Sequence, residues 1–203
     1  MDGEVKSGMS YQRKTLLTPQ EYLAIERKSE IKHEYVAGEM FAMVGAGKRH
    51  NLITANIIRV LGNQLLDRPC NVYPSDMRVK VSRTGKYTYP DVVVACAEEA
   101  FDDTENDTLL NPVVIVEVLS ESTEAYDRGK KFEQYQNIES LTEYLLVAQD
   151  SQRIEQYVRQ RNREWRYSEY HELEDVVEIN VIGCVLAVKD VYAKVELSSP
   201  RTA

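Results

Sequence analysis

Two acidic residues lie in the most apolar stretches of the chain. Asp91 follows Pro90 and begins the run Val92-Val93-Val94, and Glu117 interrupts an otherwise apolar run from 113 to 119. A carboxylate inside an apolar strand is unfavourable unless it is paired, protonated or bound to a cation. One such acid is explained as readily by a structural ion pair, whereas two acids on neighbouring strands indicate a shared cation. Ligation by oxygen alone favours Mg²⁺ or Mn²⁺.

A polar loop follows Glu117 and leads to Asp127, Lys130 and Lys131 at the start of an expected helix. Metal-assisted hydrolysis of a phosphodiester needs a cation that polarises the phosphate and activates a water, and a positive group near the developing charge. A lysine close to the two acids would supply that group. Lys131 and Tyr135 lie one turn apart on one helix face, whereas Lys130 points about 100° away in a regular helix.

The spacing of apolar residues predicts the elements that position these groups. A capping box at Thr18-Pro19-Gln20-Glu21 begins a helix that ends near residue 29, and helical periodicity predicts a second helix at 49–67. We expect a third helix at 127–137. Strands are predicted at 77–82, 87–96, 113–119 and 144–147, with antiparallel pairs within 33–44 and 154–170 and a strand and short helix within 181–195. Helices interleaved with an apolar sheet indicate an α/β fold with a mixed sheet.

The length of 203 residues favours one domain. We expect a loose arm at 1–14, a folded domain at 15–198 and a short tail at 199–203. No stretch approaches the roughly 18 apolar residues of a membrane span, and the first residues lack the apolar core of a signal peptide. Cys70, Cys96 and Cys184 form neither a disulfide framework nor a zinc pattern, so a reducing cytoplasm is the simplest compartment.

The charge is unevenly distributed along the chain. The formal net charge is −8, which by itself argues against a dedicated nucleic-acid-binding protein. Residues 1–90 carry 14 Lys and Arg against 9 Asp and Glu, whereas residues 91–203 carry 11 against 24. Much of this acid lies in runs typical of solvated surface. The net charge therefore weakens a nucleic-acid hypothesis without excluding it.

An ordered set of motifs resembles the PD-(D/E)xK nuclease superfamily and, more closely, the bacterial Uma2 family of restriction-endonuclease-like proteins, which is abundant in cyanobacteria. The resemblance extends from about Thr18 to Leu197 and implies a mixed β-sheet flanked by helices in a single domain. The matching stretches are 33–40, His50, 76–81, 89–94, 116–120, Asp127, Lys131, Tyr135 and 143–147.

The resemblance implies that Asp91 and Glu117 are the metal ligands and that the ion is Mg²⁺ or Mn²⁺. The superfamily lysine normally stands two residues after the acid, where this chain has Leu119. In the Uma2 family the lysine is thought to come from the following helix, which indicates Lys131, with Lys130 as the adjacent alternative.

Two further residues are candidates for the catalytic site. Glu34 matches an acid near the metal, and a surface charge on a hairpin is an equal alternative. His50 could contact phosphate or carry a proton, or could simply cap or pack at a helix start. Asp76, Arg78 and Lys80 are better explained by turn and surface positions.

These observations lead to the hypothesis of a metal-dependent DNA endonuclease. A second hypothesis is a nuclease-fold binding or regulatory module with weak or no catalysis, suggested by Leu119 and the acidic second half. A third is a transposon or defence component that needs a partner chain. Related nucleases often act as homodimers, so a dimer is also expected by resemblance. The DNA target and strand preference are not encoded in any evident pattern.

Overall fold

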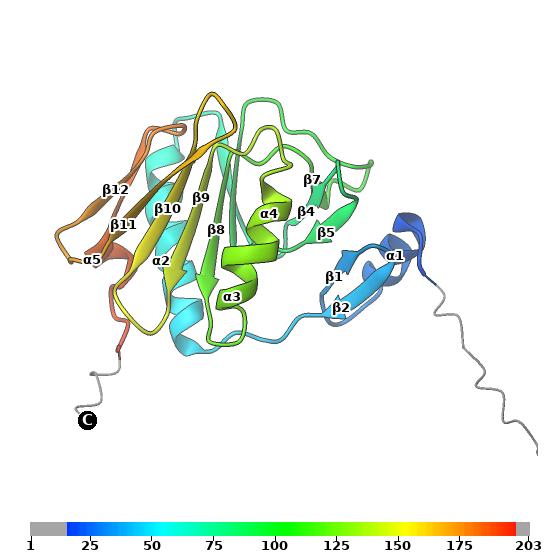
Figure 1. Ribbon diagram of the computed structural model, residues 1–203, viewed down its shortest axis with the longest axis horizontal. Coiled ribbons are helices and arrows are strands. Elements are labelled where there is room, and N and C mark those ends of the chain that lie inside the picture. The colour runs from blue at the N-terminus through cyan, green and yellow to red at the C-terminus, as the bar shows by residue number, and fades with distance from the viewer. Residues whose placement is uncertain (1–15, 198–203) are drawn as a thin grey trace, which may run out of the picture.

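The longest helix, α2 (Lys48–Leu65), forms one side of the core. Ile53, Ile57, Leu61 and Leu65 recur every fourth residue and are all buried. This spacing places them on one stripe of the helix, which packs against the central β-sheet. The computed structural model describes residues 16–197, and Figure 1 shows α2 crossing behind that sheet. The predicted arm at 1–14 and tail at 199–203 lie outside the described residues.

Six strands form the central sheet in the order β11-β10-β9-β8-β6-β3. Strands β8 and β9 are parallel and the other neighbours are antiparallel, so the sheet is mixed, as predicted. Every residue of β8 and β9 is buried, because layers cover both faces of the sheet. The strands are β3 (Cys70–Pro74), β6 (Val92–Cys96), β8 (Val114–Leu119), β9 (Glu143–Ala148), β10 (Ile154–Arg159) and β11 (Trp165–Tyr170).

Side chains of β8 alternate between two hydrophobic clusters. Val114, Val116 and Val118 face α2, the hairpin of β12 (Val176–Ile179) and β13 (Cys184–Ala187), and α5 (Val188–Val191). Ile115 and Leu119 face the opposite cluster. Because successive side chains of a strand point to opposite faces, Glu117 shares the face of Ile115 and Leu119.

This second face is covered by a helical segment in three parts: α3 (Glu124–Tyr126), the π-helical turn η1 (Asp127–Lys131) and α4 (Phe132–Tyr135). The sequence predicted one regular helix at 127–137. The observed helical segment begins three residues earlier and ends two residues earlier than predicted. It contains a π-helical turn, in which hydrogen bonds join residues five apart instead of four. Such π turns occur frequently at functional sites.

A smaller sheet lies beside this segment, in the order β2-β1-β5-β4-β7 (Figure 1). The predicted hairpin within 33–44 is confirmed and forms one edge. The predicted capping box is also confirmed, because the Thr18 side chain accepts from the Glu21 backbone and the Glu21 side chain accepts from the Thr18 backbone. The elements are α1 (Pro19–Glu26), β1 (His33–Val36), β2 (Glu39–Ala42), β4 (Arg78–Val81), β5 (Lys86–Thr88) and β7 (Thr108–Leu109).

The predicted single strand at 87–96 is instead two strands in two different sheets. Strand β5 belongs to the smaller sheet and β6 to the central one. The chain passes between the sheets through Tyr89, Pro90 and Asp91. Proline has no backbone N–H for a strand ladder, which makes this a natural point of interruption. Asp91 therefore lies just before β6, where the two sheets meet.

Strand β3 was not predicted. Its pairing with β6 also shows that the prediction of no disulfide among the three cysteines is wrong. Cys70 in β3 is the register partner of Cys96 in β6, and the two form a disulfide. The residues are 26 positions apart in sequence, so only the strand pairing brings them together. Cys184 is a buried free cysteine. The argument for a reducing compartment from unpaired cysteines is therefore removed.

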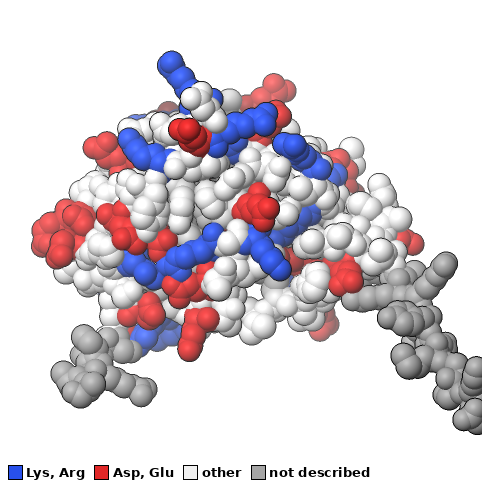
Figure 2. Space-filling model, in the orientation of Figure 1, with Lys and Arg blue, Asp and Glu red and all other residues white. Residues whose placement is uncertain are grey.

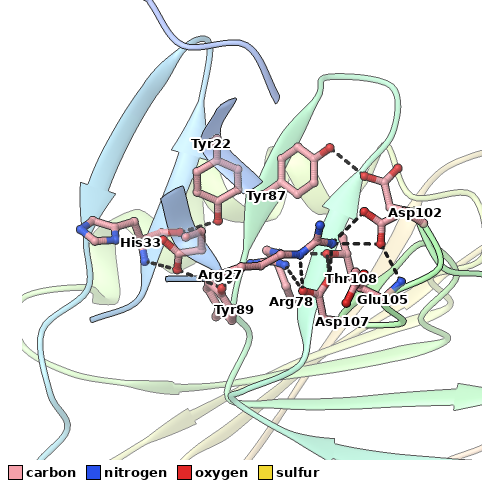
Figure 3. Close-up of polar contacts among 12 residues, drawn as sticks. Tyr22, Arg27, His33, Arg78, Tyr87, Tyr89, Asp102, Glu105, Asp107 and Thr108 are labelled. Atoms are coloured by element: carbon pink, nitrogen blue, oxygen red, sulfur yellow. Dashed lines mark hydrogen bonds and ion pairs between the residues drawn. The ribbon is translucent and has the colours of Figure 1, made fainter. Parts of the chain in front are cut away.

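Arg27, Arg78, Asp103 and Asp107 form a polar clamp that joins α1 to the smaller sheet and to the loop before β7 (Figure 3). The Arg27 guanidinium pairs with Asp103 at 2.7 Å and with Asp107 at 2.8 Å, and Arg78 pairs with Asp107 at 2.8 Å. Arg78 is buried and also donates to Tyr89 at 2.7 Å. The expectation that Arg78 decorates a solvated face is wrong, because Tyr22 of α1, Tyr89 and Asp107 enclose its guanidinium.

No helix among residues 16–197 is long and apolar enough to cross a membrane.

Candidate active site

The two acids in apolar surroundings lie on one face of the central sheet. Val92 of β6 is the register partner of Val116 of β8. In an antiparallel pair the next step along the same register brings Asp91 opposite Glu117. The backbone N–H of Val118 donates to Asp91 Oδ2 at 2.8 Å, which fixes the Asp91 carboxylate at the edge of β8. The strand pairing therefore sets the relative position of the two carboxylates.

Glu117 is almost completely buried, with 3 % of its surface exposed. Its Oε1 accepts a hydrogen bond from the Tyr135 hydroxyl at 2.7 Å and lies 2.8 Å from the Lys131 ammonium. Burial raises the pKa of Glu117 to about 8; the charge of Lys131 opposes this shift, and the charges of Asp127 and Asp91 add to it. The influence of Asp91 on this pKa reflects the proximity of the two acids.

Lys131 is the buried cation of the site. Its Nζ lies 2.8 Å from Glu117, 3.4 Å from Asp127 and 3.7 Å from Glu34. Burial disfavours the charged ammonium, but the surrounding carboxylates outweigh it and raise the pKa of Lys131 well above its ordinary value. Lys131 therefore remains protonated in this environment. Lys130, the alternative left open by the sequence, is exposed.

Asp127 lies inside η1, with Oδ1 3.4 Å from the Lys131 ammonium. Burial raises the pKa of Asp127 despite the nearby ammonium. Its contribution is therefore direct contact with the lysine.

Glu34 reaches the same lysine from the smaller sheet. Its carboxylate accepts hydrogen bonds from Thr88 and, at 3.0 Å, from Tyr126, and it lies 3.3 Å from Lys86. Burial would raise the pKa of Glu34, but the charges of Lys131 and Lys86 reverse that effect and lower it. The surface-hairpin alternative for Glu34 is thereby excluded by its burial and its contacts.

Lys86 was missed by the sequence analysis. It is 1 % exposed, donates to the Tyr126 hydroxyl at 2.7 Å and pairs with Glu34. Burial and the neighbouring Lys131 lower the pKa of Lys86, while Glu34 opposes the shift. The residues 83–86 resemble an exposed turn, so no local signal marks this lysine as buried. Only the packing of η1 and α3 over β5 encloses it.

His50 lies on the first turn of α2 and contacts Asp91, with Nε2 3.1 Å from Oδ2. Its Nδ1 is buried without a hydrogen-bond partner in the described part of the chain. His50 is therefore paired with one of the two acids and forms no hydrogen bond or ion pair with Glu117 or Lys131. Asp76, by contrast, pairs with Lys32 at the surface, outside the site.

The donor set fits a divalent cation of the Mg²⁺ type. No hydrogen bond or ion pair within residues 16–197 engages Oε2 of Glu117 or Oδ1 of Asp91, so each acid has one oxygen uncommitted. Magnesium sites commonly use one or two carboxylates with waters and substrate phosphates. No group of three or more His, Cys, Asp or Glu side chains among the described residues is arranged as an all-protein metal site.

Known proteins resemble this chain over most of its length. The model of the Uma2 family, described as "Putative restriction endonuclease", matches residues 19–189. The uncharacterized protein slr1290 of Synechocystis sp. is 37 % identical over 176 residues, covering 87 % of this chain and 91 % of its own. The uncharacterized protein sll1609 of the same organism is 38 % identical over 154 residues, covering 76 % and 87 %.

A crystal structure from Anabaena variabilis, described as "a putative nuclease belonging to DUF820", superimposes with a TM-score of 0.72 at 18 % identity. The match covers 87 % of this chain and 97 % of that one, and it shows that the two share a fold. The mixed sheet flanked by helices is thus a restriction-endonuclease-like architecture, as predicted. The match of the family model to nearly the whole folded region shows that this chain belongs to the Uma2 family.

Proposed function

We propose that this protein is a Mg²⁺- or Mn²⁺-dependent endonuclease that hydrolyses phosphodiester bonds in DNA. The observation that carries the proposal is a pair of carboxylates on adjacent strands with a buried ammonium 2.8 Å from one of them. The family description and the fold of the Anabaena protein support a nuclease.

Each polar side chain has a defined role in this proposal. Oδ1 of Asp91 and Oε2 of Glu117 would hold the ion, which when bound would polarise the phosphate and lower the pKa of a water. The Tyr135 hydroxyl fixes the orientation of Glu117. Lys131 places a positive charge beside Glu117 Oε1, where it can orient a water and stabilise negative charge on the phosphate.

Glu34 and His50 complete the proposed site, the first beside Lys131 and the second beside Asp91. Glu34 fixes Lys131 from the smaller sheet, because its carboxylate lies 3.7 Å from the ammonium. His50 orients Asp91 and could accept or donate a proton through Nε2.

Cleavage of supercoiled plasmid in Mg²⁺ or Mn²⁺ tests the proposal. Asp91→Asn and Glu117→Gln preserve the shapes of the side chains but remove the charges that hold the ion, so we expect roughly a 100-fold or greater loss of rate. Asp76→Asn, which changes an exposed acid outside the site, should leave the rate unchanged. Undiminished cleavage by both site variants would indicate a contaminant or another site.

Calorimetric titration with Mg²⁺ and Mn²⁺ distinguishes the enzyme from the binding module of the same fold. Binding that disappears in Glu117→Gln supports the metal-dependent enzyme, whereas no binding to the wild-type protein favours the module. Cleavage that appears only after addition of a partner chain would support the transposon or defence hypothesis. A homodimer and a cytoplasmic location stay predictions, the first to be checked by light scattering.

A further inference from the structure

A cavity lies away from the acids, at the C-terminal end of α4. Its volume is about 690 Å³, and it opens between the turn after β4, the segment that follows α4 and the β10–β11 hairpin. We call it the arginine pocket, after Arg83, Arg159 and Arg163, which line it together with Trp165. None of the five candidate site residues lines this cavity.

Arg159 is held rigidly in the wall of the arginine pocket. Its Nε donates to the carbonyl of Leu141 at 2.7 Å, and its Nη2 donates to those of Gln136 and Ile138 at 3.0 and 2.8 Å. The guanidinium also lies over the Trp165 ring, 4.6 Å from the centroid. Its Nη1 has no hydrogen-bond partner among the residues that the structure describes. A planar donor fixed in this way loses little conformational freedom when it binds an anion.

Arg159 forms no ion pair with a carboxylate within residues 16–197. Arg78, Arg128 and Arg153, which are also wholly or partly buried, each pair with an acid. Burial and the charge of Arg163 lower the pKa of Arg159, and the charge of Glu139 opposes that shift. The carbonyls that hold Arg159 satisfy Nε and Nη2, so the remaining donor and the positive charge are available to an anion.

Two exposed arginines add to this charge. Arg83 and Arg163 lie on separate turns at the mouth of the pocket, and neither has an acidic partner in the described part of the chain. Lys80, which also lines the pocket, is neutralised by Asp102 at 2.6 Å. The acidic residues in the lining are Glu133 and Glu139. Figure 2 shows Lys and Arg side chains gathered around the upper end of the face that α4 covers, with fewer acidic ones among them.

We propose that the arginine pocket binds a backbone phosphate of a nucleic-acid strand outside the candidate cleavage site. Three guanidinium groups, one from the turn after β4 and two from the β10–β11 hairpin, line a space large enough for a phosphate with its sugars, and arginine forms bidentate hydrogen bonds with phosphate. The choice of a nucleic acid rests on the proposed function, whereas the chemistry of anion binding does not.

The test is the fluorescence anisotropy of a labelled 20-base-pair duplex, titrated with protein in EDTA so that no cleavage occurs. In the double variant Arg83→Ala/Arg163→Ala we expect the Kd to rise by about 10-fold. The slope of log Kd against log salt concentration should fall by about one phosphate contact. Both arginines are exposed, so the fold should be preserved. Arg161→Ala is the matched control, because it removes an arginine from the same hairpin that does not line the pocket.

A Kd that is equal in the double variant and in Arg161→Ala, or an absence of duplex binding by the wild-type protein, overturns the proposal. If AMP or inorganic phosphate displaces the duplex at a concentration equal to that of the duplex, the pocket binds a free phosphate compound. That outcome also overturns the proposal that it binds a nucleic-acid strand. The Glu117→Gln variant, measured in both the cleavage and the binding assay, separates the two proposals. If duplex binding depends on the arginines but no metal-dependent cleavage occurs, only the nuclease proposal is refuted. If cleavage occurs but duplex binding does not depend on the arginines, only the pocket proposal is refuted.

Discussion

At the scale of single residues, two adjacent lysines occupy opposite environments. Lys131 is buried among Glu117, Asp127 and Glu34, whereas Lys130 is exposed. The difference arises from helical geometry, because consecutive side chains of a helical turn point in different directions around its axis. Only the inward lysine can neutralise the buried acids. The chemical identity of the residue is therefore less informative than its position on the helix.

Replacement of Lys131 by methionine should affect both stability and cleavage. The change leaves Glu117 and Asp127 buried without their cation, and breaking a buried pair in this way costs about 3 kcal/mol. We also expect loss of plasmid cleavage, because the positive charge beside Glu117 is removed. Urea unfolding and the plasmid assay measure the two effects.

The control for this prediction is Lys130→Met, which removes an equal charge from the exposed neighbour. Its free energy of unfolding should stay within about 0.5 kcal/mol of the wild-type value. Equal effects of the two substitutions on stability would show that Lys131 is not the buried cation.

At the scale of elements, the polar clamp fastens α1 to the loop before β7. The Arg27 guanidinium, supported by Arg78, holds the pKa of Asp107 well below its ordinary value of 3.8, and Arg27 also lowers the pKa of Asp103. Because these pKa values are lower in the folded chain than in the unfolded one, the ionised acids stabilise the fold. That contribution is present above about pH 4 and is lost as the pH falls.

Asp107→Asn should therefore lower the Tm at pH 6 but have a smaller effect at pH 2, where the wild-type acid is also becoming protonated. Thermal unfolding followed by circular dichroism at the two pH values measures the difference. Asp76→Asn, at an exposed ion pair with Lys32, should change the Tm little at either pH. A difference for Asp107→Asn that grows toward pH 2 would contradict the assigned direction.

The disulfide joins two neighbouring strands, β3 and β6, and closes a segment of 26 residues. A cross-link over a loop of this length stabilises a fold by about 3 kcal/mol through the entropy of the unfolded chain. Under oxidising conditions Cys70→Ser should lose about that amount in urea unfolding. In a reducing buffer the variant and the wild-type protein should differ little.

Cys184→Ala is the control for the disulfide, because Cys184 is free and buried. Its effect on the free energy of unfolding should be the same with and without reductant. A Cys70→Ser variant whose stability loss is also independent of reductant would mean that the bond does not form in solution.

At the scale of the whole molecule, the central sheet separates two cores. The larger core lies between the sheet and α2, and the smaller lies beneath α4. Ile57 belongs to the larger core and none of the candidate site residues does. We expect Ile57→Ala, at a fully buried position of α2, to lower the free energy of unfolding by about 3 kcal/mol.

The matched control for this core prediction is Leu66→Ala, at the end of the same helix and 80 % exposed. It should change the free energy of unfolding by no more than about 0.5 kcal/mol. A loss at Leu66 comparable to that at Ile57 would show that another surface covers Leu66 in solution.

Much of the architecture was predictable because burial and period leave local marks. The repeat of Ile53, Ile57 and Leu61 predicted α2, and the apolar run from 113 to 119 predicted β8. The strand predicted at 87–96 was wrong because a continuous pattern does not reveal a change of sheet. The regular helix at 127–137 was wrong because no local pattern distinguishes a π turn from an α turn.

The sequence by itself determined that Asp91 and Glu117 belong to apolar surroundings, since an ionised carboxylate in such a run needs a specific partner. Only the tertiary structure decided which partners they have. Glu34, Lys86 and Lys131 are far apart along the chain and meet because two sheets and η1 pack together. The Cys70–Cys96 pairing depends in the same way on strand register. Local patterns report the environment of a residue, whereas long-range packing selects its neighbours.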